Sequence, residues 1–298
     1  MDRTAQLAPV VARHAPRTGT YDTALRCLSL FRADEPTLPI PSVYAASLCL
    51  IAQGRKRVSI GSHSLVYDAS HYLIVSVDLP LTGHIIEASA DEPYLCCQIN
   101  LDLAVLADLI VGSRSDGATA LSPVLAVYPI DPDLVDAVCR LVKLLDQPES
   151  IPALAPLIER EILYRLLIGP HGPTLRHLAV VDTHLNQVSR AIARIHAGFR
   201  EQLRIRDIAA AAGMSESALH EHFKAITRLT PLEYQKQLRL QEARRLMLAQ
   251  GASAGAAGFA VGYESPSQFS REYRRLFGAP PRQDVDRMQM GQDYLSVA

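Results

Sequence analysis

The sequence predicts an α+β protein with an N-terminal β-barrel or jelly roll, a helical hairpin, and an all-α C-terminal domain containing two helix-turn-helix units. Short apolar runs broken by turn residues fill residues 21–100. Apolar residues then recur at helical spacing, and Gly213 and Gly262 are each followed two or three residues later by a serine. With 298 residues, the chain is long enough to form two separate cores.

Six segments in the N-terminal part predict strands, because they are rich in β-branched and aromatic residues. Gly54, Gly61 and Gly83 are interpreted as the turn residues between them. The charged run at 54–57 is interpreted as a hairpin end, with an anion-binding patch as the alternative. The predicted strands are residues 42–53, 57–60, 64–68, 71–79, 84–88 and 93–101. Strands this short and evenly spaced are typical of a small barrel or jelly roll.

Helical periodicity begins after the last of these strands. Residues 102–111, 134–145 and 153–168 have apolar side chains at helical spacing. The sequence QPESIP between the second and third helices predicts the turn of a helical hairpin. The glycine- and proline-rich stretch at 169–174 predicts a linker.

The first C-terminal unit, residues 204–227, predicts a short helix, a tight turn and a second helix. Gly213 suits the left-handed conformation that ends a helix, and Ser215 can cap the next one. In that second helix the apolar side chains fall on one face, and the polar ones fall near the opposite face. The apolar positions are Leu219, Phe223 and Ile226, and the outer positions include Ser217, Ala218, Glu221 and Lys224. This pattern is typical of a helix-turn-helix.

A long helix over residues 230–248 is predicted to connect the two units. Thr230 can cap it, Pro231 fits its first position, and Glu233 completes a capping box. At ~1.5 Å per residue the helix is roughly 28 Å long. That length suits a spacer between two elements that read DNA about one turn apart, ~34 Å.

The second unit, residues 258–278, repeats the pattern with Gly262 at the turn, Ser265 as cap and Gln268 as the partner of Ser265 in a capping box. The predicted buried face consists of Phe269, Tyr273, Leu276 and Phe277. The predicted outer face consists of Ser267, Gln268, Arg271, Arg274 and Arg275. Arginine can read guanine and glutamine can read adenine in a major groove, so this face suits DNA. A helical bundle with a solvated basic face is the alternative.

The distribution of charge supports a polyanionic partner for the C-terminal part. The whole chain has a net charge of −1, but the part from Thr183 onward has +5 and the remainder −6. The five cysteines have no metal-ligand spacing, which indicates a reducing compartment. Adjacent Cys96 and Cys97 are expected on opposite faces of a strand. A redox-sensing cysteine is an open alternative.

The C-terminal region resembles the AraC/XylS family of transcriptional regulators over about 100 residues. The motifs are AxxxGMSxSxLxxxFK in the first unit and VGYESPSQFSREYRRLFGAPP in the second. PSVYAASLCLIAQGRKRV and YDASHYLIVSVDLP resemble the cupin-like regulatory domain of one AraC subgroup. The resemblance implies a barrel that senses a small molecule, a helical pair that often mediates dimerisation, and transcription control through the C-terminal units.

The resemblance also implies a division of the chain. We expect an N-terminal arm at 1–20, a cupin-like regulatory and dimerisation domain at 21–168, a linker at 169–182, an AraC-type DNA-binding domain at 183–285 and a tail at 286–298. The expected partners are double-stranded DNA, a small-molecule effector, RNA polymerase and a second copy of the chain. The expected DNA-binding residues are Ser217, His220, Glu221, Lys224, Ser267, Gln268, Arg271, Arg274 and Arg275.

Three features depart from the family pattern. Glu221 stands where an arginine is usual, and a carboxylate near phosphates is repulsive, although it can accept a hydrogen bond from cytosine. Arg228 stands where a helix-ending glycine is common. The helix before the second turn, residues 251–260, is rich in glycine and alanine where larger aliphatic residues are usual. Because of Glu221, we expect the second unit to supply most of the DNA affinity.

An enzymatic barrel fused to a DNA-binding tail is the alternative interpretation. The barrel contains His63, His71, His84 and Glu87, but it lacks the paired histidine spacing of metal-binding cupins. His84 and Glu87 are three apart in a predicted strand and therefore face opposite ways. No phosphate-binding loop, GxSxG elbow or HExxH motif occurs. We expect no enzymatic activity, no cofactor and no metal.

The composition and N-terminus bear on location. The mean hydropathy is +0.07, and no apolar run reaches the ~20 residues that a membrane span needs. The first residues contain no long apolar block typical of a secretory signal. We therefore expect a cytoplasmic protein.

Overall fold

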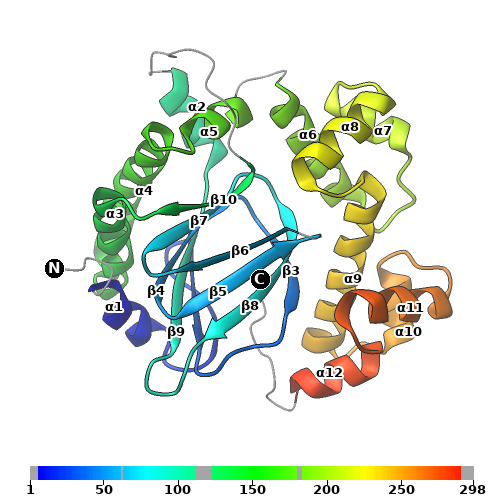
Figure 1. The fold of residues 1–298 in the computed structure, drawn as a ribbon, viewed down its shortest axis with the longest axis horizontal. Helices are drawn as coiled ribbons and strands as arrows, with labels where there is room; N and C mark the ends of the chain where they lie inside the picture. Colours follow the sequence, from blue (N-terminus) through cyan, green and yellow to red (C-terminus); the bar gives the residue numbers. More distant parts are fainter. Residues whose placement is uncertain (1–5, 62, 112–122, 180–182, 290–298) are drawn as a thin grey trace.

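The computed structural model describes residues 6–61, 63–111, 123–179 and 183–289 (Figure 1). A sheet-rich N-terminal part and a helical C-terminal part lie side by side and contact each other through β3 (Ile40–Tyr44) and α9 (Pro231–Gln250). Parts of the predicted arm (1–5), linker (180–182) and tail (290–298) lie outside the described residues. Within the described part, no helix is both long and apolar enough to cross a membrane.

The N-terminal strands form two antiparallel sheets. One sheet has the order β1 (Gly19–Asp22), β2 (Leu28–Ala33), β9 (Tyr94–Asn100), β4 (Ser47–Gln53), β7 (His71–Val75) and β10 (Leu125–Pro129). The other has the order β3, β8 (Leu79–Glu87), β5 (Arg55–Ile60) and β6 (His63–Asp68). The predicted fold class is confirmed as a jelly-roll-like pair of sheets rather than one closed barrel.

Alternation along the strands separates an inner core from an outer one. Cys49 and Cys96 of the larger sheet lie in the core between the sheets, together with Val58 and Tyr67 of the smaller sheet. The neighbouring residues Leu50 and Cys97 face a second core under the helices. Cys96 and Cys97 thus lie on opposite faces, as expected.

Two predictions for the N-terminal part need correction. Gly83 is not a turn residue but lies inside β8, where a Cβ atom would come within 2.7 Å of the Tyr44 hydroxyl and 3.1 Å of Lys56 Cε. Lys56 is not at an exposed hairpin end but is buried, because it shares its strand face with Val58 and Ile60. Strand β10, beyond the predicted strand region, was not expected.

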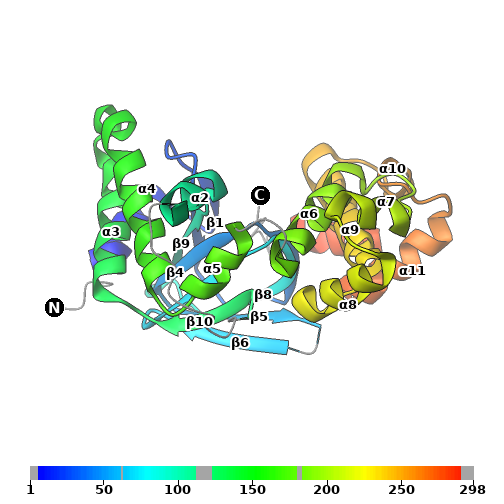
Figure 2. The ribbon, with the colours of Figure 1, turned by 90° about the horizontal axis from the view of Figure 1, so that it is seen from above.

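The helices of the N-terminal part cover the outer face of the larger sheet. The predicted helices and hairpin are present, joined by two short 3₁₀ turns at Leu144–Asp146 and Pro148–Ser150. The predicted arm is in fact partly helical, because Leu7, Val10 and Val11 pack against the sheet. These helices are α1 (Leu7–His14), α2 (Leu103–Val111), α3 (Pro132–Lys143) and α4 (Ile151–Ile168). Figure 2 places α3 and α4 at the end of the molecule away from the C-terminal helices.

The predicted linker contains a helix, α5 (Gly172–Ala179). Just before it, His171 is fully buried, with Nε2 2.6 Å from the Ser76 hydroxyl and Nδ1 3.2 Å from the Tyr128 hydroxyl. The glycine and proline residues of this stretch therefore lie at the start of a helix that packs against the sheet, and this part of the predicted linker is not a flexible connection.

His171 is expected to make the fold sensitive to acid. Burial lowers the pKa of His171 to about 4, from about 6.5 in an unfolded chain. The unfolded state therefore takes up a proton first, and the free energy of unfolding should fall as the pH drops from about 6.5 towards 4, by roughly 3 kcal/mol in total. Urea unfolding at pH 7 and pH 5 measures the difference.

The variant His171→Gln should lose this part of the pH dependence while it keeps a side chain able to bond Ser76. His220→Gln, at an exposed position of the C-terminal part, controls for the loss of one histidine. Equal pH dependence in the wild type and His171→Gln would contradict the assignment.

The C-terminal part begins with α6 (His184–Gly198), whose buried side chains join the same core as the interior of the two sheets. A separate small core lies under the last helices and contains Leu240, Met247 and Phe269. The remaining helices are α7 (Ile205–Ala212), α8 (Glu216–Thr227), α10 (Ala254–Ala260), α11 (Pro266–Phe277) and α12 (Pro281–Gln289). Helix α9 belongs to both cores and so connects the two units.

Candidate functional site

The first C-terminal unit has the predicted geometry. Gly213 ends α7 in the left-handed conformation (φ 70°), and the Ser215 hydroxyl accepts from the Ala218 amide at the start of α8. Leu219 and Phe223 are fully buried and Ile226 packs against the same core. The turn and cap therefore fix α8 with its apolar side inward.

The outer side of α8 contains the first group of predicted DNA-binding residues. Ser217, His220, Glu221 and Lys224 are all exposed. Only Lys224 is cationic, so this helix presents a mixed rather than a basic surface. The helix ends at Arg228, the one non-glycine residue with positive φ (64°) among the described residues. A side chain in this conformation costs free energy that a glycine would not.

The connecting helix α9 begins with the predicted capping box between Thr230 and Glu233. It has 20 residues, which corresponds to about 30 Å. Leu240, Ala243 and Met247 are buried in the core of the second unit, as expected.

The second unit also has its predicted turn and cap. Gly262 has φ 89°, and the Ser265 hydroxyl accepts from the Gln268 amide. The Gln268 side chain does not complete the expected capping box but donates to Glu272 Oε1 at 3.4 Å. One glycine of α10 has a packing reason, since a Cβ at Gly258 would come within 3.0 Å of the Phe269 ring.

Helix α11 separates its buried and exposed faces sharply. Phe269 and Tyr273 are buried, and Leu276 and Phe277 pack partly against the same core. The predicted outer residues are all exposed: Ser267, Gln268, Arg271, Arg274 and Arg275. None of the three arginines forms an ion pair with another of the described residues, and this leaves three cations available to an anionic partner.

A buried ion pair supports α11 from behind. The Arg244 guanidinium donates to both carboxylate oxygens of Asp284, at 2.9 and 3.2 Å, and Tyr273 donates to the same carboxylate at 2.7 Å. These bonds join α9, α11 and α12 and orient the helix that presents the arginines.

The junction between the two domains is held by a polar cluster on α6 and α9. The Tyr234 hydroxyl donates to the Asp78 carbonyl at 2.8 Å and lies 3.0 Å from His196 Nε2. His196 Nε2 is also 3.8 Å from the Asp78 carboxylate. Burial lowers the pKa of His196, and the Asp78 charge opposes that shift in part. The sheet-rich N-terminal part and the helical C-terminal part are therefore in direct hydrogen-bonded contact.

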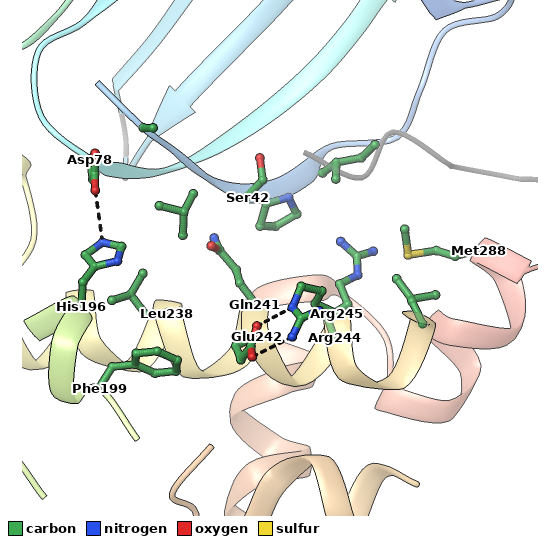
Figure 3. Close-up of a pocket in the computed structure, with 15 residues that line it drawn as sticks. Ser42, Asp78, His196, Phe199, Leu238, Gln241, Glu242, Arg244, Arg245 and Met288 are labelled. Carbon is green, nitrogen blue, oxygen red and sulfur yellow. Dashed lines mark hydrogen bonds and ion pairs between the residues drawn. The ribbon is translucent and has the colours of Figure 1, made fainter. Parts of the chain in front are cut away.

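A cavity of about 390 Å³ lies beside this cluster (Figure 3). Strand β3 forms one wall, and α6, α9 and α12 form the others. Gln241 extends from α9 toward the strand. The sequence did not indicate this site, because its residues come from segments far apart in the chain.

The interior between the sheets contains an unexpected cation. The Lys56 ammonium lies 5.2 Å from the centre of the Tyr44 ring and 5.9 Å from those of Phe31 and Tyr94. The cavity beside it measures only about 20 Å³, room for one water molecule. The alternation of the strand Arg55–Ile60 is the sequence signal that could have revealed this buried lysine.

The candidate metal ligands of the sheet domain are not gathered at one point. His63 is exposed at the start of β6, and His71 bonds Asp68 at 3.0 Å. His84 and Glu87 lie opposite Arg57 and Arg55, which share one face of β5. The expectation that they face opposite ways is therefore wrong, because a β-bulge shifts the register between the two pairs. In the part of the chain that the structure describes, no three His, Cys, Asp or Glu side chains form a metal-binding group.

Comparisons with known proteins agree with both domains. A family model described as "AraC-type transcriptional regulator N-terminus" matches residues 24–174, about half of the chain. A second, described as "Helix-turn-helix domain", matches residues 208–287.

Among curated proteins, the transcriptional activator RhaS of Escherichia fergusonii is 30% identical over 159 residues, 52% of this chain and 56% of that protein. The transcriptional regulator ArgR of Pseudomonas aeruginosa is 29% identical over 108 residues, 36% of this chain and 33% of that protein. The chain thus spans about half or less of the length of these relatives.

Among solved structures, ToxT from Vibrio cholerae with a bound unsaturated fatty acid has a TM-score of 0.57. The alignment covers 87% of this chain and 94% of that one at 11% identity, which supports the shared fold alone. The model of the AraC-type N-terminus covers half of this chain, and the helix-turn-helix model matches the residues that follow. The chain therefore belongs to the family of AraC-type transcriptional regulators.

Proposed function

We propose that the protein binds double-stranded DNA in a sequence-specific way and regulates transcription. The observation that supports this most is the exposed face of α11, where Gln268, Arg271, Arg274 and Arg275 lie opposite the buried Phe269. Arginine and glutamine are the side chains that read guanine and adenine, and free arginines also pair with phosphates.

The first unit contributes through Ser217, His220, Glu221 and Lys224 of α8. The two recognition helices are joined by α9, whose length of about 30 Å suits two contacts separated by about one turn of DNA. We divide the chain accordingly into a regulatory part up to residue 168 and a DNA-binding part from residue 183. The proposal includes contact between the DNA-bound protein and RNA polymerase, through which transcription is regulated.

Binding of purified protein to fragmented genomic DNA, followed by sequencing of the retained fragments, tests the proposal. We expect a recurring motif with two contacted segments about one helical turn apart. Affinity for that motif should fall steeply as the salt concentration rises, because arginine–phosphate contacts release counterions. Retention of fragments without a shared motif would contradict sequence-specific binding.

We further propose that the N-terminal domain receives the signal, as a small molecule, and pairs two copies of the chain. The outer face of α4 supports the pairing, because it exposes large apolar side chains. Leu154, Leu157, Tyr164 and Ile168 are 43, 64, 51 and 60% exposed. At 100° per residue these positions lie within one side of the helix. A strip of exposed apolar side chains, interrupted by Glu161, favours a protein partner.

The variant Leu157→Glu is expected to dissociate the dimer, with association weakened at least tenfold, because it places a charge in the centre of the strip. Its fold should be unaffected, since the side chain is exposed. Val66→Glu, at an exposed apolar position on β6, is the matched control and should remain dimeric. Sedimentation velocity distinguishes the states, and a Leu157→Glu protein that sediments like the wild-type dimer would rule out α4 as the interface.

A further inference from the structure

The junction cavity has the size and lining of a small-molecule site. Its volume of about 390 Å³ lies within the range of about 300–1,000 Å³ that is typical of ligand pockets. Its apolar lining comes from both domains and from the last described helix. It includes Ile40, Val43, Phe199, Leu238, Leu248 and Met288.

The side chain of Gln241 is the unusual feature of this cavity. Its amide nitrogen and oxygen are both buried, and neither has a hydrogen-bond partner among the described residues. A buried amide without partners is unfavourable, and such groups are rare in folded proteins. By contrast Gln235, on the same helix, donates to the carbonyls of Phe199 and Glu201, both at 3.0 Å.

The charged side chains that line the cavity already have hydrogen-bond or ion-pair partners. Glu242 bonds Arg245 and Arg200, each at 2.7 Å. Arg244 bonds Asp284 at 2.9 Å, and Asp78 accepts from the Ala46 amide at 3.0 Å and faces His196 at 3.8 Å. Figure 3 shows the Glu242–Arg245 pair on the α9 side and the Asp78–His196 pair near the strand. The cavity therefore presents hydrophobic surface, the unmet Gln241 amide and the Ser42 hydroxyl, which is also buried without a partner among the described residues, while its charged side chains are bonded elsewhere.

We propose that this cavity binds a neutral, mainly hydrophobic small molecule that has one carboxamide or lactam group. An amide edge offers a donor and an acceptor side by side, so a second amide edge satisfies both atoms of Gln241 at once. An anionic ligand would place an uncompensated charge against the apolar walls and is disfavoured.

Occupation of this cavity would couple the two domains. The ligand contacts β3 on one side and α9 on the other, so it stabilises the docked arrangement relative to any in which the domains separate. Helix α9 also connects α8 and α11, the two helices proposed to contact DNA. The effect of this coupling on DNA rests on the proposed DNA-binding function, whereas the binding of the small molecule to the cavity does not.

Calorimetric titration of the full-length protein, without DNA, tests the binding. The probes are benzamide and phenylacetamide, with benzoate as the anionic analogue. We expect both amides to bind the wild type and benzoate to bind at least tenfold more weakly. Because no DNA is present, failure of the DNA-binding proposal would leave this result unchanged.

Two glutamine variants separate the site from the fold. Gln241→Leu should keep or raise the melting temperature, since it removes an unpaired buried amide, and should weaken amide binding at least tenfold. Gln235→Leu should lower the melting temperature, since it removes two buried hydrogen bonds to the Phe199 and Glu201 carbonyls, but should bind the amides within twofold of the wild type. The inference is overturned if neither amide binds, if benzoate binds equally well, or if Gln241→Leu binds the amides like the wild type.

Discussion

Replacing Arg271 with alanine is expected to weaken binding to the target DNA by about 1–3 kcal/mol, roughly fivefold to 160-fold. Arg271 is exposed on the outer face of α11, and Phe269 and Tyr273 hold that helix from behind. A side chain in this position can reach base edges, and a bidentate arginine–guanine contact has about this strength.

Glu221→Ala is the substitution whose effect on DNA affinity should be compared with that of Arg271→Ala. Glu221 is exposed on α8 at the position where the family pattern has an arginine. Removing a carboxylate near phosphates should leave the affinity unchanged or increase it. Fluorescence anisotropy with the same duplex compares both variants, and a larger loss for Glu221→Ala than for Arg271→Ala would show that the first unit dominates.

The same titrations distinguish the roles of the arginines. A residue that reads a base should lose discrimination at one base pair, whereas a phosphate contact should weaken all sequences alike and lower the salt slope by about one. Arg274→Ala and Arg275→Ala are the comparison variants, because both lie exposed on the same helix.

Local sequence signals predicted the C-terminal units well because those signals act over a few residues. The turns at Gly213 and Gly262 require positive φ, and the caps at Ser215 and Ser265 satisfy nearby amides. Each of these features follows from residue type and spacing. The same holds for most strands between residues 40 and 100, whose alternation is short-range.

What depends on long-range packing was not predictable in this way. The burial of His171 depends on Ser76 and Tyr128, which come from segments far earlier in the chain. The junction cavity brings β3 together with α9, and the unmet amide of Gln241 is visible only when that contact exists. Glycine and proline at 169–174 looked like a linker because composition does not reveal what a segment packs against.

Gly262→Ala is expected to have the largest effect on stability. The second unit meets the loop after α6 at this residue, and a Cβ atom there would lie 2.0 Å from the Arg200 carbonyl oxygen. Arg239 fixes the same contact from α9 by donating to the Phe199 carbonyl at 2.6 Å and the Gly262 carbonyl at 2.9 Å. The overlap is with backbone, so no side-chain rotation relieves it.

We expect Gly262→Ala to lower the free energy of unfolding by about 3 kcal/mol or more, since it combines this clash with a positive φ of 89°. Gly278→Ala is the matched control, because Gly278 also has positive φ (80°), but a Cβ atom there would meet no described atom within 4 Å. It should cost only about 1 kcal/mol. Urea unfolding of the two variants isolates the clash from the backbone strain. Equal losses would mean that the loop after α6 yields to the new methyl group, and that the two units are less tightly joined than Arg239 and Gly262 indicate.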